Sequence, residues 1–310
     1  MFHLRTIEYL ADPLLRGMYG PSVGTGLAIA VLAAPLSVLV VLKRLAFIGQ
    51  GISHAAFGGW GLASVLAGVG TAGGVLAVLS RAAGTTPGQM TIVYIFCVLA
   101  ALLVGWMSDA GRSGRGRSVE PDTAIGIVLV SSMALGAILN RLAREPRPWE
   151  SFLFGSVLEC GPADVFASVA GAGVVLLALW LLRRPLTFWA FDEAGAAAFG
   201  VRGGAMSAAL MALLALGTVL AMRLVGVVPA TALLVLPGAA SLRMSRRSGA
   251  VLGGAWAVAV LGVLGGLFAS FEFDLLPGAS IVLALALFYA VAPGVGVLAS
   301  RVASSRKEPS

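Results

Sequence analysis

Two polar side chains, Gln50 and His54, lie four residues apart in an apolar stretch, FIGQGISHAAFGG, at residues 47–59. In a helix, residues four apart lie one turn apart on the same face, so the amide and the imidazole are predicted to face the same way, together with Gly58. A neutral imidazole binds zinc and other divalent transition-metal ions. One histidine defines no coordination sphere, so two interpretations stay open: an ion ligand, or a histidine whose ring N–H bonds a neighbouring carbonyl.

Two further patterns concern catalysis. GPSVG at residues 20–24 matches the G-x-S-x-G pattern of serine hydrolases, and an intramembrane hydrolase using Ser22 and His54 is a second hypothesis. That motif needs a strand–turn–helix setting, whereas here it precedes an apolar run. Neither lysine, Lys43 or Lys307, follows a glycine as in a phosphate-binding loop, so any energy from ATP is expected to come from another subunit.

The elements that position these residues are expected to be transmembrane helices. Hydrophobic residues make up 59% of the 310 residues, charged residues only 11%, and the mean hydropathy is +0.97. A soluble core cannot bury that much apolar surface, so the sequence predicts an integral membrane protein. The 41 glycines favour close helix packing in lipid. The net charge of +7 resides mainly in short loops, which is typical of membrane topology rather than of nucleic-acid binding.

A helix needs about 20 apolar residues to cross a bilayer. Nine stretches qualify, which predicts an all-α polytopic bundle with spans at 22–42, 52–79, 89–107, 123–142, 164–182, 204–222, 226–242, 250–271 and 278–298. The stretch 52–79 is long and 226–242 contains Pro229 and Pro237, so either can be broken or re-entrant, and the expected range is eight to ten.

Lys and Arg set the expected orientation, because cytoplasmic loops are enriched in both. Basic residues cluster at 43–44, 112–117, 183–202, 243–247 and 301–307. In the loop at 271–277, by contrast, the charged residues are both acidic, Glu272 and Asp274. The C-terminus is therefore predicted to be cytoplasmic. We expect an N-terminal tail at 1–21, one permease domain at 22–300 and a C-terminal tail at 301–310.

The cytoplasmic segment 183–203 is predicted to contain a short helix. Asp192 and Glu193 begin an Ala-rich stretch that includes Ala197 and stops at Gly200. Acidic residues favour helix starts and glycine favours helix ends. The segment is either an interfacial linker helix or a docking helix for a cytoplasmic partner.

Five ordered blocks resemble the permease subunit of ABC-3 family importers for zinc, manganese or iron. The stretch at 47–59 resembles a signature helix in which an Asp and a His sit four apart before Ala. DTAIGIVLVSSMALG at 122–136 resembles an Asp-Thr-Ala-Ile-Gly segment followed by paired serines. The stretch at 152–165, FLFGSVLECGPADV, is similar to a Leu-Phe-Gly motif. The stretch at 191–201, FDEAGAAAFGV, is similar to a cytoplasmic coupling segment. The stretch at 224–241, LVGVVPATALLVLPGAAS, is similar to a Val-Gly segment with a Leu-Pro-Ala/Gly end.

The resemblance implies a multi-pass permease of the cell membrane, similar to type II ABC importers, that is not itself an enzyme. It implies a homodimer or pair of permeases in membrane lipid, a cytoplasmic P-loop ATPase and an extracytoplasmic metal-binding protein, with no nucleic acid. The transported metal ion is the substrate, and no permanent cofactor is expected. Permeases for siderophore- or cobalamin-like chelates are the alternative within transport.

The resemblance also assigns candidate residues. His54 and Gln50 would line the ion path, although the family has a carboxylate where this chain has Gln50. Asp192, Glu193, Ala197 and Gly200 would contact the ATPase. The remaining positions in the matched blocks are possible pathway or structural residues, namely Asp122, Ser131, Ser132 and Pro237.

Overall fold

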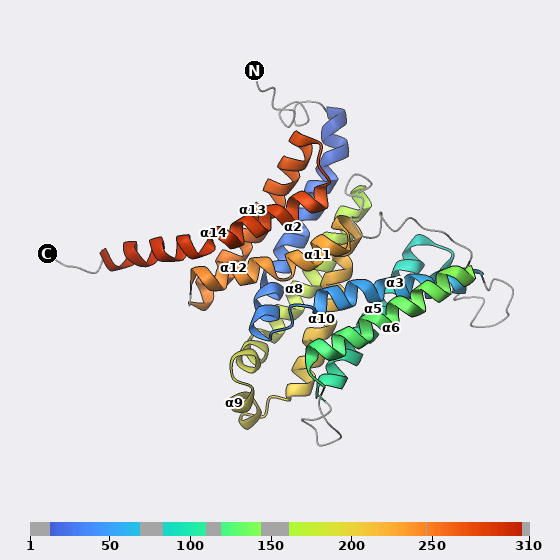
Figure 1. Cartoon of the computed structure of the whole chain (residues 1–310), viewed down its shortest axis with the longest axis horizontal. Coiled ribbons are helices and arrows are strands. Elements are labelled where there is room, and N and C mark those ends of the chain that lie inside the picture. Colours follow the sequence, from blue (N-terminus) through green and yellow to red (C-terminus); the bar gives the residue numbers. More distant parts are fainter. Residues whose placement is uncertain (1–12, 69–82, 110–118, 144–160, 246, 306–310) are drawn as a thin grey trace. The chain divides into compact units, whose positions relative to one another are not determined.

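The computed structural model describes residues 13–68, 83–109, 119–143, 161–245 and 247–305, and the regular elements in these ranges are helices (Figure 1). In chain order they are α2 (Pro13–Leu42), α3 (Ile48–Gly68), α5 (Thr86–Asp109), α6 (Pro121–Ala143), α8 (Pro162–Phe191), α9 (Glu193–Ala198), α10 (Gly203–Val225), α11 (Val227–Leu233), α12 (Leu236–Met244), α13 (Ser248–Phe273) and α14 (Pro277–Ser305).

Within these ranges, seven helices are long and apolar enough to cross a membrane. They are Gly20–Leu42, Pro87–Ser108, Pro121–Ala143, Pro162–Phe191, Gly203–Met222, Ser248–Phe273 and Pro277–Gly294. The expected all-helical, multi-pass architecture is therefore confirmed. The expected count of nine spans is not confirmed.

The two predicted spans missing from this set are the stretches noted above as open to interruption. The stretch 226–242 forms two short helices, α11 and α12, so the prediction of one continuous span there is wrong. Gly226 precedes α11 with φ 86°, Val235 interrupts the helix with φ −123° and ψ −53°, and Pro237 lies in the first turn of α12, where its missing N–H costs no helix bond. Of the stretch 52–79, α3 covers residues up to Gly68, and 69–79 lie outside the described residues.

The chain divides into two compact units. Unit 1 comprises Met1–Ala46, Leu153–Ala178 and Leu220–Ser310, and unit 2 comprises Phe47–Phe152 and Leu179–Val219. In unit 1, α12, α13 and α14 pack against one another, and α2 packs on α12 and α13. In unit 2, α3 packs against both α5 and α6.

Close packing in unit 1 depends on small residues. A Cβ at Gly238 of α12 would collide with the backbone of Ser37 in α2 and would lie 2.6 Å from the Val38 nitrogen. A Cβ at Gly266 of α13 would likewise collide with the backbone of Ile281 in α14. Glycine thus lets these helix backbones approach in the way expected of lipid-embedded bundles.

A tryptophan compensates for a proline inside α2. Pro35 has no N–H, so the carbonyl of Val31, four residues earlier, loses its helical donor. The indole Nε1–H of Trp256, on α13, donates to that carbonyl at 3.0 Å. The hydrogen bond satisfies a group that lipid cannot satisfy and joins the two helices.

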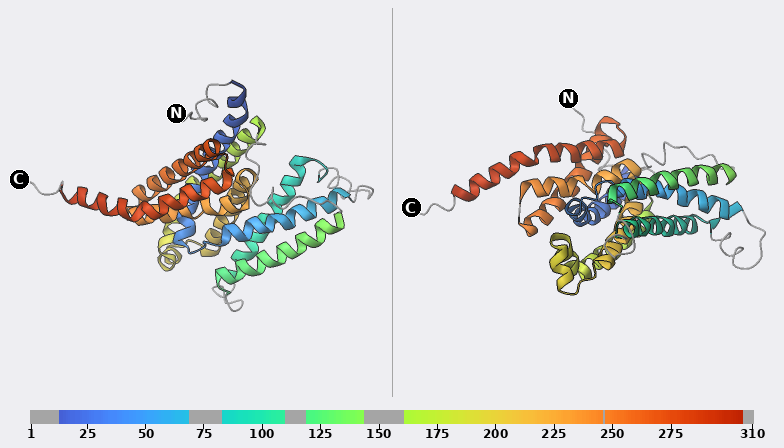
Figure 2. Two further views of the ribbon diagram at one scale, coloured as in Figure 1. Left: turned by 45° about the horizontal axis from the view of Figure 1, so that its top comes forward. Right: turned by 60° about the horizontal axis from the view of Figure 1, so that its bottom comes forward.

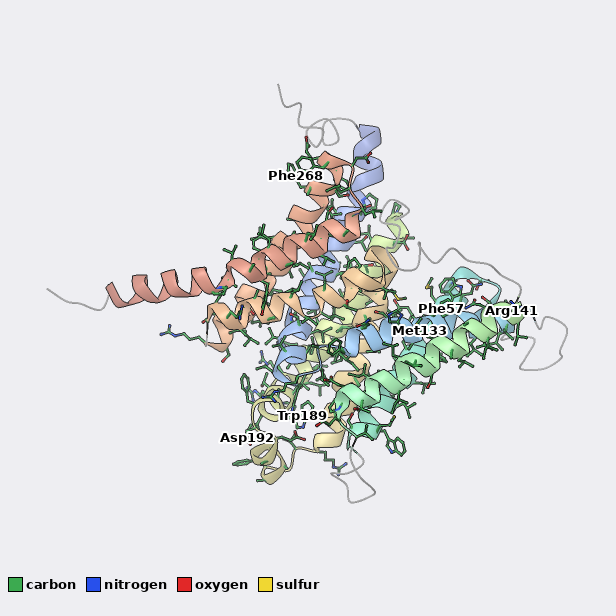
Figure 3. The ribbon with its side chains drawn as sticks, viewed as in Figure 1. Phe57, Met133, Arg141, Trp189, Asp192 and Phe268 are labelled. Atoms are coloured by element: carbon green, nitrogen blue, oxygen red, sulfur yellow. The ribbon has the colours of Figure 1, made fainter. Side chains whose placement is uncertain are left out.

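In unit 2, α3 and α6 run side by side in the same direction (Figure 2). A Cβ at Gly58 would lie 2.9 Å from the Ser132 carbonyl oxygen, and one at Gly61 would lie 3.0 Å from that of Gly136. In return, a Cβ at Gly136 would lie 2.8 Å from the carbonyl oxygen of Phe57, the residue labelled on α3 in Figure 3. These contacts fix the register of the two helices.

Candidate functional site

In the first part of α3, from Ile48 to Ala56, the two predicted polar residues are the ones that are not buried, and they form what we call the polar strip of α3. Gln50 is exposed and His54 is half-buried, one turn further along. The residues around them are buried, including Gly49, Gly51, Ile52 and Ala55. The helical phase predicted from the sequence is thus observed, because Gln50 and His54 share a face. Gly58, one turn beyond His54, is buried against α5 and α6.

A third polar side chain lies on the same turn of α3. Ser53 is 0% exposed, and its hydroxyl has no hydrogen-bond partner among the described residues. It is three residues after Gln50 and adjacent in sequence to His54. The sequence interpretation above missed Ser53, and the signal that pointed to it was its i+3 spacing from Gln50. Close by, the Cys97 thiol of α5 donates to the Ile52 carbonyl at 3.6 Å.

The other predicted pathway residues lie on α6 and α12. Asp122 is exposed in the first turn of α6, Ser131 is exposed, and Ser132 is buried with its carbonyl against Gly58. Pro237 is buried in the first turn of α12, where its role is structural as described above. Within the described ranges, no three His, Cys, Asp or Glu side chains come together as a metal cluster.

The predicted cytoplasmic helix is present as α9. Asp192 is its N-cap, labelled in Figure 3, and its Oδ1 accepts a hydrogen bond from the Gly195 N–H at 2.9 Å. Glu193 is the first helical residue, where its negative charge complements the helix dipole. These two acids explain why a helix begins here.

The end of α9 is a Schellman motif. Gly200 has φ 82°, its N–H donates to the Ala197 carbonyl at 3.0 Å, and the Val201 N–H donates to the Ala196 carbonyl at 2.9 Å. Only glycine adopts that φ without strain. Ala197 is exposed, whereas Ala196 is buried, so α9 has one packed face and one free face among the described residues.

An exposed aromatic pair adjoins α9. Phe199 is 82% exposed, and its ring packs at a tilt on Phe188 with the centroids 5.8 Å apart. Phe191, at the end of α8, is also exposed. Sequence reasoning did not single these residues out, although an aromatic residue directly before a helix-ending glycine and outside the apolar spans was a readable signal.

The hydrolase hypothesis does not fit the structure. Residues 20–24 lie within the continuous helix α2, not in a strand–turn–helix, and Ser22 is buried. A nucleophile elbow requires a sharp turn that exposes the serine. The G-x-S-x-G pattern is therefore a chance match inside a membrane helix.

Comparisons with known proteins agree with the architecture. The family model described as "ABC 3 transport family" matches residues 20–295. A manganese transport system membrane protein, MntC of Halalkalibacterium halodurans, is 29% identical over 302 residues, covering 95% of this chain and 94% of its own. A high-affinity zinc uptake system membrane protein, ZnuB of Haemophilus influenzae, is 27% identical over 270 residues, covering 87% and 94%. Among solved structures, PsaBC from Streptococcus pneumoniae in complex with a Fab superposes with a TM-score of 0.73 at 25% identity, covering 93% of this chain and 95% of that chain.

Proposed function

The chain belongs to the ABC 3 transport family, and we propose that it is the permease subunit of an ATP-driven importer for divalent transition-metal ions, manganese, zinc or iron. It is a multi-pass membrane protein of the plasma membrane and a transport component rather than an enzyme. The relatives reported above are named for manganese and zinc transport. The ion is cargo, held transiently on its way through.

The observation that carries the proposal is the polar strip of α3. His54 is one of two histidines in the sequence, and it and Gln50 are the two residues between Ile48 and Ala56 that are not buried. Ionisable residues in apolar spans are costly and typically mark a pathway. An imidazole nitrogen and an amide oxygen together suit zinc, manganese and iron.

Gln50 stands where the family has a carboxylate, and this exchange is expected to set how strongly the site binds its ion. An amide keeps an oxygen ligand but adds no negative charge, so the ion is held more weakly than by aspartate. Weak binding is compatible with conduction, because the ion must leave as well as enter. A homodimer would bring two such strips together and supply two imidazoles and two amides.

Coupling to ATP hydrolysis is assigned to α9. We place it on the cytoplasmic side, where its free face, which includes Ala197, would contact a separate P-loop ATPase. The capped ends at Asp192 and Gly200 support this role, because a helix fixed at both ends transmits movement to α8 and α10. The C-terminus and the basic loop at 243–247 are on the same side, and an extracytoplasmic binding protein delivers the ion to the opposite side.

The experiment compares His54→Ala with His54→Gln in cells that depend on this importer. Uptake of radioactive manganese and zinc is measured at low external concentration, with permease abundance checked in membranes. We expect both variants to lose uptake at normal abundance, because glutamine keeps a hydrogen-bonding side chain but not the imidazole nitrogen. Normal uptake by His54→Ala, or rescue by His54→Gln, would reduce His54 to a hydrogen-bonded structural residue.

A further inference from the structure

Ser53 differs from other hydroxyl-bearing residues in the described helices. Thr25 donates back to the Pro21 carbonyl of its own helix at 2.7 Å, and Thr218 donates to that of Leu214 at 2.7 Å. Such back-bonding is the default for serine and threonine in membrane helices. The hydroxyl of Ser53 makes no such bond and is fully buried. A buried hydroxyl with no protein partner is available to a ligand from outside the chain, such as an ion or a water molecule.

The position of Ser53 indicates which kind of ligand its hydroxyl would bind. Residues i, i+3 and i+4 of a helix have Cβ atoms about 5–6 Å apart, so Gln50, Ser53 and His54 form a triangle on one turn. Two of its corners are the proposed ion ligands. No bond to protein has to be broken before the Ser53 oxygen can coordinate a cation.

We propose that the Ser53 hydroxyl is a third ligand of the transported ion, in an occluded form of the site in which Gln50, Ser53 and His54 all contact the metal. This inference rests on the proposed function, since it adds a ligand to that same path. Two oxygens and one nitrogen form a harder donor set than the imidazole and amide alone. Hard oxygen donors favour manganese, whereas imidazole and thiolate favour zinc. Ser53 therefore biases the site toward manganese.

The test measures equilibrium binding of manganese(II) and zinc(II) to the purified permease assembled with its ATPase in nanodiscs. Ser53→Ala is expected to weaken manganese binding about tenfold, as loss of a group supporting a metal site does, and to weaken zinc binding less. Ser53→Cys, which offers sulfur, is expected to reverse the preference toward zinc. The matched control is Ser64→Ala, a buried serine about three turns further along α3, and this variant should leave both affinities unchanged.

The outcomes separate this inference from the proposed function. If the unaltered complex binds manganese, His54→Ala abolishes binding and Ser53→Ala binds as before, the third ligand is refuted and the permease assignment stands. If the unaltered complex binds neither ion, both fail. A gain in thermal stability for Ser53→Ala is expected in either case, because it removes an unpaired buried hydroxyl. Stability alone therefore does not count as support.

Discussion

Replacing Trp256 with phenylalanine should destabilise unit 1 by removing one hydrogen bond. The indole N–H donates to the Val31 carbonyl at 3.0 Å, and that carbonyl lost its helical donor to Pro35. Phenylalanine keeps an aromatic ring but no donor. Both Val31 and Trp256 are partly exposed, and both lie in helices that are long and apolar enough to cross a membrane. Lipid offers no replacement donor.

Two general energies bound the size of the effect. An acceptor left unsatisfied away from water costs about 1–3 kcal/mol, while interhelical hydrogen bonds in membrane proteins average about 0.6 kcal/mol and reach about 1.7 kcal/mol. We therefore expect Trp256→Phe to lower the unfolding free energy by about 1–2 kcal/mol. Trp256 is 40% exposed, so the smaller ring forfeits little burial.

A double-mutant cycle isolates the hydrogen bond. Pro35→Ala restores an N–H that can reach the Val31 carbonyl within α2, so Trp256→Phe in that background should cost about 1 kcal/mol less. Lost packing of the indole appears in both backgrounds and cancels. Unfolding is followed by circular dichroism during titration with SDS in mixed micelles.

The control is Trp106→Phe, because that indole is 67% exposed on α5 and the substitution should be nearly neutral. Equal costs of Trp256→Phe with and without Pro35 would refute the reasoning. The indole would then contribute only its contact area.

Three more predictions follow from local geometry. Ala197→Trp, on the free face of α9, should leave the complex assembled and hydrolysing ATP while metal uptake falls at least tenfold; normal uptake would contradict the docking role. Gly238→Ala should lower the unfolding free energy by about 1–3 kcal/mol because its Cβ would meet the backbone of α2, whereas Gly253→Ala, with open space around it, should not. Arg44 has φ 55°, in the left-handed region, so Arg44→Gly should stabilise the protein by about 0.5–1 kcal/mol in thermal melts, whereas Arg44→Ala should not. Equal gains for both variants would show that the lost charge, rather than the backbone, causes the effect.

Local sequence signals predicted local structure well. The acids at 192 and 193 and the glycine at 200 predicted α9, because caps are satisfied by residues within a few positions of the helix end. Pro229 and Pro237 indicated that the stretch 226–242 could break, because a proline has no N–H to donate within a helix. The i+4 spacing of Gln50 and His54 gave their shared face, since helical phase needs only the chain itself.

Non-local contacts could not be read in this way. The bond from Trp256 to Val31 joins residues 225 positions apart, and nothing in either segment names the other. The depth of α3 between α5 and α6 depends on register, which is set by close contacts such as that of Gly58 with the Ser132 carbonyl. In the sequence, Ser53 and Gln50 are simply two polar residues in an apolar run. Without knowledge of the register, the sequence does not tell which of them is buried and which is exposed.

The packing of α3 bears on how the proposed site selects its ion. Glycine on both α3 and α6 places the two backbones in contact, so α3 cannot rotate alone without forcing α6 to move. The backbone positions of Gln50, Ser53 and His54 are therefore set by helix packing rather than by their side chains. In such a site, a substitution at one ligand position changes the charge and hardness of that ligand but leaves the backbone of α3 where it is. The proposed selectivity thus follows from the chemical nature of three side chains, which is why single substitutions at 50, 53 and 54 are expected to move affinity and preference separately.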